Sequence, residues 1–176
     1  MSDQPNILVM MTDQQRFDSL GCYGFEAGHT PNLDHLAAEG VLFEHCYANA
    51  IPCTPSRASM PTGKHAPGHG VYKLYDNLPE DEVLITRRLQ SMGYQTALVG
   101  KLHVCSRVYE AVRRHPNDGF DIYVYCIDPA IYLGVPLNAY ARWLEKTYPA
   151  VYERLCRGQR MYIPREAHIT HCAAQE

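Results

Sequence analysis

The chain has 176 residues and a formal net charge of −3, with 16 basic and 19 acidic side chains and histidine counted as neutral. Hydrophobic residues make up 46% of it, which predicts one globular domain with a sizeable core rather than a disordered chain. The slightly acidic balance argues against nucleic-acid and membrane-surface proteins, because both classes usually carry a basic excess.

The first residues contain neither a basic segment nor the apolar core of a signal peptide. The first apolar run, 7–11, is too short to cross a membrane. The seven cysteines are scattered without a Cys-x-x-Cys pair, so we expect reduced thiols, a cytoplasmic chain and no disulfide framework. Six of them are expected to be small buried hydrophobic residues, namely Cys22, Cys46, Cys105, Cys126, Cys156 and Cys172.

Hydrophobic patterns and turn residues predict strands that alternate with helices. The run 7–11 is continuously apolar between turn residues, which is typical of a strand buried on both faces. Thr30 and Pro31 favour a helix start, and Gly40 favours its end. In chain order we expect strands over 7–11, 41–47, 96–99 and 120–126, and helices over 30–40, 54–63, 81–92 and 138–148. This alternation predicts an α/β fold with a mostly parallel central sheet flanked by helices, and the pattern weakens after Pro149.

Reactive side chains follow three of these elements, at the carboxyl ends of strands where open α/β sheets bind ligands. Asp13 and Gln14 come after the first predicted strand. Their carboxylate and amide oxygens form half of a site for a hard divalent cation. An Asp after a strand is also a common turn former, so further ligands are needed to complete such a site.

Cys53 stands at the start of a predicted helix, where backbone N–H groups and the helix dipole favour an anion. Arg57, one turn later, adds a cation with the planar geometry that binds oxyanions. The plainer alternative is a buried cysteine before a capped helix, with a solvated arginine.

Lys101 and His103 follow the strand over 96–99. In an extended segment, positions two apart share a face, so both side chains are expected to point at one cleft. A solvated lysine and a hydrogen-bonded histidine are the alternative. His65 and His69 lie in a glycine-rich loop and are a weak zinc pattern without a helix to carry them. We expect them to be loop residues at the mouth of the site.

Four segments in order resemble the sulfatase family of the alkaline-phosphatase-like superfamily. The run Cys-Thr-Pro-Ser-Arg-Ala-Ser-Met-Pro-Thr-Gly-Lys at 53–64 is similar to the family signature, Cys-x-Pro-Ser-Arg followed by Thr-Gly. Residues 5–14 are similar to the family's opening strand and metal-binding turn, 30–34 to the helix that follows, and 100–103 to its Gly-Lys-x-His motif. The resemblance covers residues 5–121 well, whereas 122–176 look like a variable insertion and the start of the next segment.

The resemblance implies a hydrolase of sulfuric esters with formylglycine as its nucleophile. A separate maturation enzyme would oxidise Cys53 to this aldehyde, whose hydrate attacks the sulfur of a small sulfate ester and releases the alcohol and then sulfate. A divalent cation would be held by Asp13, Gln14 and the modified Cys53, with Ca²⁺ preferred and Mg²⁺ or Mn²⁺ as alternatives. Arg57 would orient the formylglycine, Lys101 would bind the sulfate oxygens, and His103 would carry a proton.

The chain departs from the family pattern in three ways. Many members have two adjacent acids where this chain has Asp13 and Gln14, and the Asp-Gln form resembles choline-sulfatases and phosphonate or aryl ester hydrolases. Hydrolysis of phosphonate or phosphate esters is therefore an alternative. Pro61 is expected to end or bend the helix and to shift Arg57.

The third departure is length, because family members run to several hundred residues and further ligands lie downstream. We therefore expect residues 1–176 to be the N-terminal part of a catalytic domain, incomplete on its C-terminal side and inactive alone. A catalytically inactive truncated remnant is a further hypothesis, and a zinc or thiol-redox module is a distant one. The basic stretch 104–117 either borders the pocket for the alcohol or is a solvated loop.

Overall fold

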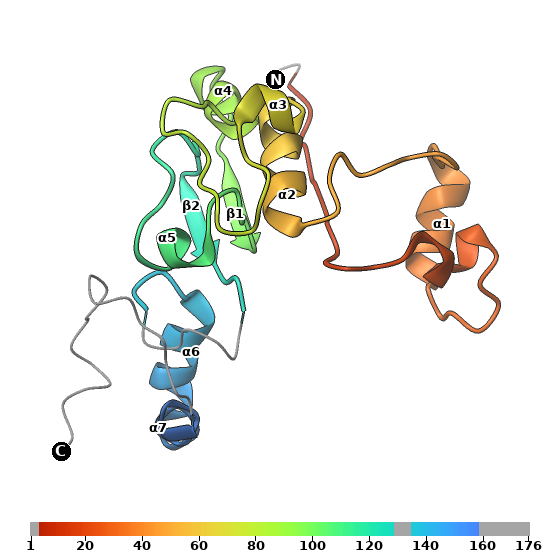
Figure 1. The fold of residues 1–176 in the computed structure, drawn as a ribbon. Helices are drawn as coiled ribbons and strands as arrows, with labels where there is room; N and C mark the ends of the chain where they lie inside the picture. The colour runs from red at the N-terminus through yellow and green to blue at the C-terminus, as the bar shows by residue number, and fades with distance from the viewer. Residues whose placement is uncertain (1–3, 129–134, 159–176) are drawn as a thin grey trace. The chain divides into compact units, whose positions relative to one another are not determined.

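The computed structural model describes residues 4–128 and 135–158 (Figure 1). The chain divides between Tyr47 and Ala48 into two compact units. Across the described residues, no helix combines the length and the apolar character that crossing a membrane requires.

The first unit contains two short 3₁₀ turns, η1 at Phe17–Ser19 and η2 at Gly21–Tyr23, and the helix α1 at Pro31–Glu39. The predicted helix over 30–40 is confirmed, with Thr30 as its N-cap residue and Gly40 as its C-cap residue. The Thr30 hydroxyl does not cap the helix but donates to the Asp34 carboxylate at 3.0 Å. That carboxylate also accepts the N–H of Cys22 at 2.7 Å, so Asp34 ties η2 to α1.

The strands predicted over 7–11 and 41–47 are wrong, because neither segment is a strand in the structure. The apolar side chains of the first segment are exposed, with Leu8 at 81% and Val9 at 69%. A strand needs a neighbouring backbone to pair with its N–H and C=O groups, and within the described residues neither segment forms such a ladder. Asp13 and Gln14 therefore follow an unpaired extended segment rather than the end of a strand.

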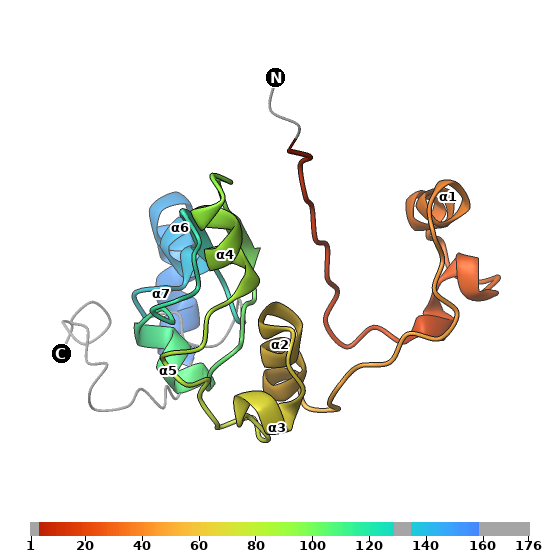
Figure 2. The ribbon, with the colours of Figure 1, turned by 90° about the horizontal axis from the view of Figure 1, so that it is seen from above.

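The second unit carries a parallel strand pair, labelled in Figure 1, with helices before, between and after the strands along the chain; Figure 2 shows the helices from above. Its elements are α2 at Cys53–Thr62, α3 at Ala66–His69, α4 at Ile85–Ser91, β1 at Ala97–Gly100, α5 at Arg107–Val112, β2 at Ile122–Tyr125, α6 at Ala139–Thr147 and α7 at Pro149–Gly158. The register runs from Ala97 opposite Ile122 to Gly100 opposite Tyr125. Parallel strands need a crossover connection, and α5 lies within it. The predicted parallel α/β arrangement is confirmed.

Element boundaries follow tertiary contacts as well as local signals. The helix expected over 81–92 begins only at Ile85, because the preceding Leu84 is fully buried and its N–H donates to the Asn117 carbonyl at 3.2 Å. Pro61 lies in the last turn of α2, which ends one residue later at Thr62 with Gly63 as its C-cap residue, so the helix ends close to this proline, as expected.

Three helices formed where the sequence predicted none or only a weak pattern. Helix α3 lies in the stretch expected to be a glycine-rich loop, α5 lies inside the stretch 104–117, for which no helix was predicted, and α7 follows Pro149 directly. Helix α6 was predicted correctly, and the side chain of Asn138 caps it by accepting the N–H of Ala141 at 3.0 Å. The segment 168–176 lies outside the described residues.

The main core joins α2 to the segment that follows β1. It consists of Ala58, Val71, Leu78, Leu84, Leu102, Val104, Cys105 and Tyr125. A second cluster of Ala141, Leu144 and Tyr152 packs α6 against α7. Cys105 is buried as expected, whereas Cys46 is exposed, contrary to the prediction, and Cys172 lies outside the described residues. The core thus anchors Leu102 and Val104, the two neighbours of His103.

Candidate active site

Cys53 is the first residue of α2, a helix of ten residues, and its side chain is half-buried. Pro52 precedes it in an extended conformation, and the Pro52 carbonyl accepts the N–H of Ser56 at 3.2 Å. The first N–H groups of a helix have no partner inside the helix, so this end favours a negative charge. An anionic group bound beside Cys53 suits this position.

Arg57 connects α2 to the end of β1. Its side chain is buried, and Nη1 donates to the Lys101 carbonyl oxygen at 2.6 Å. The solvated arginine that the sequence left open is therefore excluded. Because Arg57 lies four residues after Cys53, the two side chains stand on the same face of the helix.

His103 makes the second connection between the same two segments. Its ring is buried, and Nε2 lies 3.0 Å from the Thr54 hydroxyl. That hydroxyl also lies 3.3 Å from the Leu74 carbonyl, which can only accept. The arrangement therefore has Thr54 donating to Leu74 and accepting from the imidazole N–H.

The backbone at His103 is left-handed, with φ of 60°. The extended geometry from which we expected Lys101 and His103 to share a face is therefore wrong. Lys101 is held against α2 through its carbonyl and His103 through its ring. The structure still brings the helix that carries Cys53 against the segment that carries Lys101 and His103.

Asp13 and Gln14 belong to the first unit, where both are exposed. Gln14 has φ of 58°, and it shares a positive φ only with His103 among the non-glycine residues that the structure describes. Such conformations cost free energy and gather at functional sites. Both strained residues are thus ones that the sequence analysis selected on chemical grounds.

The donor chemistry of Asp13 and Gln14 fits a hard cation, because a carboxylate oxygen and an amide oxygen are the ligands that such cations prefer. Within residues 4–128 and 135–158, no three side chains of His, Cys, Asp or Glu gather as a metal site. Two such side chains are too few to complete a cation site by themselves.

Sequence reasoning missed Glu110, which lies in α5 and is 1% exposed. Its carboxylate accepts the backbone N–H of His103 at 2.8 Å and the Tyr125 hydroxyl at 2.8 Å. Burial raises the pKa of Glu110, against the effect of the hydrogen bonds that it accepts. No sequence signal identifies this residue, because a glutamate in a short basic stretch is by default solvated.

His69 is not at the mouth of a site, contrary to the prediction, because its ring is buried between α2 and the chain after α3. Nδ1 accepts the N–H of Val71 at 3.1 Å, so Nε2 carries the proton and donates to the Ser59 hydroxyl at 2.9 Å. Burial lowers the pKa of His69. His65 is exposed, so the two histidines do not form a metal pair.

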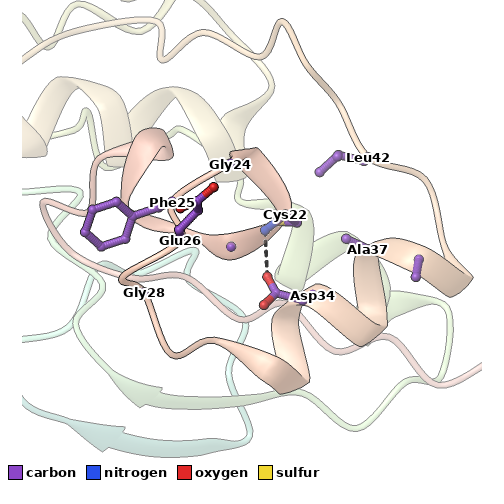
Figure 3. A pocket seen from close by; sticks show the side chains of 10 residues that line it. Cys22, Gly24, Phe25, Glu26, Gly28, Asp34, Ala37 and Leu42 are labelled. Atoms are coloured by element: carbon purple, nitrogen blue, oxygen red, sulfur yellow. Dashed lines mark hydrogen bonds between the residues drawn. The ribbon is translucent and has the colours of Figure 1, made fainter.

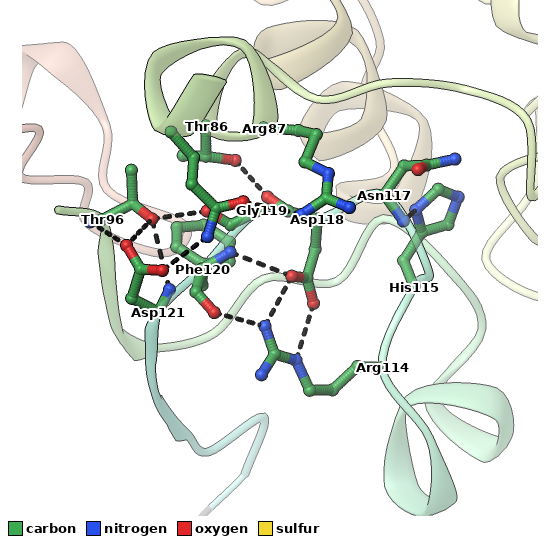
Figure 4. A network of polar contacts seen from close by, with 11 residues as sticks. Thr86, Arg87, Thr96, Arg114, His115, Asn117, Asp118, Gly119, Phe120 and Asp121 are labelled. Atoms are coloured by element: carbon green, nitrogen blue, oxygen red, sulfur yellow. Dashed lines mark hydrogen bonds and ion pairs between the residues drawn. The ribbon is translucent and has the colours of Figure 1, made fainter. Parts of the chain in front are cut away.

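A polar network closes the opposite end of the strand pair (Figure 4). Thr96 and Asp121 immediately precede β1 and β2, and the Asp121 carboxylate accepts the N–H of Thr96 at 2.8 Å. Arg114 forms a two-pronged ion pair with Asp118, at 2.6 and 2.9 Å. Arg114 from the basic stretch 104–117 is thus used to fix the strand starts.

A cavity with a volume of about 560 Å³ lies in the first unit (Figure 3). Cys22, Phe25, Asp34 and Leu42 are among the residues that line it. Within this lining the Cys22 N–H donates to the Asp34 carboxylate, a partly buried hydrogen bond that already ties η2 to α1. None of the predicted site residues lines this cavity.

Comparison with known proteins places this geometry in a family. The sequence profile of the sulfatase family matches residues 5–130, and the chain belongs to that family. N-acetylglucosamine-6-O-sulfatase of Bacteroides thetaiotaomicron is 40% identical over 103 residues, which are 58% of this chain and 18% of that protein. Human arylsulfatase D is 40% identical over 134 residues, which are 68% of this chain and 23% of that protein.

Two solved structures share the fold. BT4656, in complex with its substrate D-glucosamine-2-N,6-O-disulfate, superimposes with a TM-score of 0.59 at 37% identity and covers 68% of this chain and 22% of its own. The phosphonate monoester hydrolase of Agrobacterium radiobacter has a TM-score of 0.61 at 27% identity, and the match covers 71% of this chain and 26% of the hydrolase chain. The expected alkaline-phosphatase-like α/β fold is confirmed, and the chain spans about a fifth to a quarter of the length of these relatives.

Proposed function

We propose that this chain carries part of the active site of a sulfuric ester hydrolase, with Cys53 as the precursor of a formylglycine nucleophile. The observation that carries the proposal is the junction between the start of α2 and the end of β1, formed by Arg57 on the Lys101 carbonyl and by His103 on Thr54. Membership of the sulfatase family and relatives that are named for sulfate esters support it.

Each side chain at the junction has a role in this proposal. The start of α2 favours the charge of a sulfate group beside the residue derived from Cys53. Arg57 is fixed by its bond to the Lys101 carbonyl, so its guanidinium orients the formylglycine without reorganising during the reaction. Lys101 binds the sulfate oxygens, and His103 carries the proton.

The cation is assigned to Asp13, Gln14 and the modified Cys53, with Ca²⁺ as the first choice and Mg²⁺ or Mn²⁺ as alternatives. When bound, the cation would lower the pKa of a hydroxyl on the formylglycine hydrate and so supply the oxygen nucleophile of the reaction. The proposal also requires a maturation enzyme that oxidises Cys53 and a small sulfate ester as substrate.

The first test is mass spectrometry of the peptide that contains Cys53, after expression of the 176-residue chain with a formylglycine-generating enzyme. Replacement of the thiol by an aldehyde lowers the mass of this peptide and supports the proposal. The variant Cys53→Ala gives the unmodified reference. A thiol that survives quantitatively in the wild-type peptide contradicts the proposed nucleophile.

The second test measures hydrolysis in a hybrid enzyme, in which residues 5–130 replace the corresponding segment of the Bacteroides relative. We expect a folded hybrid that carries formylglycine to hydrolyse an aryl sulfate in a metal-dependent manner. A folded and modified hybrid without any esterase activity would contradict the proposal.

Hydrolysis of phosphonate or phosphate esters is the second candidate function. The likeness to a phosphonate monoester hydrolase and the Asp13-Gln14 pair favour it. Sulfate and phosphonate esters of one alcohol, compared by kcat/KM, separate the two candidates. A preference for the phosphonate ester would replace the sulfatase assignment.

A further inference from the structure

The carboxylate of Glu110 is surrounded by hydrogen-bond donors from two segments. Oε2 accepts the backbone N–H of His103 and the Tyr125 hydroxyl, each at 2.8 Å, and Oε1 accepts the backbone N–H of Cys105 at 3.0 Å. The two N–H groups come from the segment after β1, and Tyr125 is the last residue of β2. One buried side chain therefore fixes the site-side ends of both strands.

These bonds act where the backbone is strained. A left-handed conformation at a non-glycine residue persists only where its surroundings hold it in place. Two hydrogen bonds hold His103 in place: its backbone N–H donates to Glu110, and its ring contacts the Thr54 hydroxyl. Glu110 thus determines the direction in which the His103 side chain leaves the backbone.

Tyr125 in turn orients Glu110. Burial and the negative charge of Glu110 raise the pKa of Tyr125 well above its usual range, so its hydroxyl stays protonated and donates. A buried carboxylate is a costly group unless its oxygens are hydrogen-bonded, and here the His103 N–H, the Cys105 N–H and the Tyr125 hydroxyl all donate to it. An apolar residue of this size would fill the same space without orienting any of the three groups.

We propose that Glu110 is a positioning residue for His103, and that Tyr125 holds Glu110 in the required orientation. The catalytic meaning of this assignment rests on the proposed function, in which His103 carries a proton. The geometric part does not, because it concerns the conformation of His103 in the chain itself.

The test is NMR spectroscopy of the 176-residue chain with ¹⁵N-labelled histidine and backbone amides. The variant Glu110→Gln keeps the shape of the side chain but leaves only one acceptor oxygen for three donors. We expect it to shift the His103 amide proton upfield and to change the ring ¹⁵N signals of His103. Tyr125→Phe removes one donor only and should produce smaller shifts in the same direction.

Asp118→Asn is the matched control, because Asp118 is another buried carboxylate of the same unit and pairs with Arg114 at the opposite end of the strand pair. A purely structural role for Glu110 predicts that Asp118→Asn disturbs His103 as much as Glu110→Gln does, and that result would overturn the proposal. So would His103 signals that stay unchanged in Glu110→Gln. If Glu110→Gln does not fold, Tyr125→Phe against Asp118→Asn decides the question.

This experiment separates the two proposals. If Cys53 is never converted to an aldehyde but the His103 signals respond to Glu110 and not to Asp118, the proposed function fails and the positioning role stands. If the hybrid enzyme hydrolyses sulfate esters but the His103 signals do not change in Glu110→Gln, the positioning role fails and the proposed function stands.

Discussion

The two ends of the β1–β2 pair are both tied by networks of polar groups, and they differ in what those groups hold. At the strand starts, Thr96, Arg114, Asp118 and Asp121 bind one another and fix the chain (Figure 4). At the strand ends, the network holds a strained His103 against a helix that begins with Cys53, the proposed precursor of the nucleophile. A dense polar network is therefore not a site by itself; the strained backbone at His103 and its contact with the helix of Cys53 distinguish the two ends.

The largest effect is expected when a conservative arginine substitution at one end of the strand pair is compared with one at the other end. Arg57→Lys keeps the charge but loses the planar group that reaches the Lys101 carbonyl, and we expect kcat of the hybrid enzyme to fall roughly 10²- to 10³-fold. Arg114→Lys loses the two-pronged pair with Asp118 and should lower stability by about 1–3 kcal/mol while kcat of the folded protein is kept. The assay is aryl sulfate hydrolysis together with thermal unfolding. Equal losses of kcat in both variants would show that the two ends do not differ in function.

The sequence predicted those elements whose signals are local. Helix α1 has a proline directly after its N-cap residue, and α6 is capped by Asn138. Both strands of the parallel pair are short apolar runs. The segment 7–11 has an equally strong apolar run and is not a strand, because a strand depends on a partner that no local pattern supplies.

The candidate site was predictable only as a set of side chains. The motifs identified Cys53, Arg57, Lys101 and His103. The acceptor of the Arg57 hydrogen bond is a backbone carbonyl, however, and because every residue has one, the sequence does not show which carbonyl is used. Glu110 was missed because its partners are backbone N–H groups and a tyrosine fifteen positions later. The left-handed His103 overturned the extended geometry that had linked it to Lys101.

A second prediction sharpens the view that the strand starts are closely packed. Gly63 and Gly119 share a φ of 67°, but a Cβ at Gly119 would collide with the Arg87 backbone, whereas nothing lies near one at Gly63. We expect Gly63→Ala to cost about 1–2 kcal/mol from the left-handed conformation alone. Gly119→Ala adds overpacking and should cost about 2–5 kcal/mol. Urea unfolding of the two variants measures the difference, and equal losses would contradict the close packing.

A third prediction concerns the buried pair of Ser59 and His69, which lies on α2 but outside the junction. Ser59→Ala removes the acceptor of the His69 Nε2–H and should lower stability by about 1–2 kcal/mol.

Because burial lowers the pKa of His69 in the folded state, the unfolded chain takes up the proton first. Stability is therefore complete above the unfolded pKa of about 6.5 and declines as the pH falls below it towards the folded pKa.

Urea unfolding between pH 7.5 and pH 5, values chosen about one unit or more either side of the unfolded pKa, measures this decline. His69→Gln should remove the part of the decline that comes from this residue, whereas His65→Gln, at an exposed position of the same segment, should leave the profile unchanged. A profile that responds equally to both changes would place the titrating group elsewhere.

The smallest effect is expected at Lys64, whose ammonium contacts the Glu82 carboxylate at 2.6 and 2.8 Å. The lysine side chain is 47% exposed, so Lys64→Gln should lower stability by less than about 1 kcal/mol, and added salt should erase the difference. The positive charge of Lys64 also helps to lower the pKa of His69, so its removal should make the loss of stability in acid slightly smaller. A large loss of stability in Lys64→Gln that persists at high salt would contradict a solvent-exposed ion pair between Lys64 and Glu82.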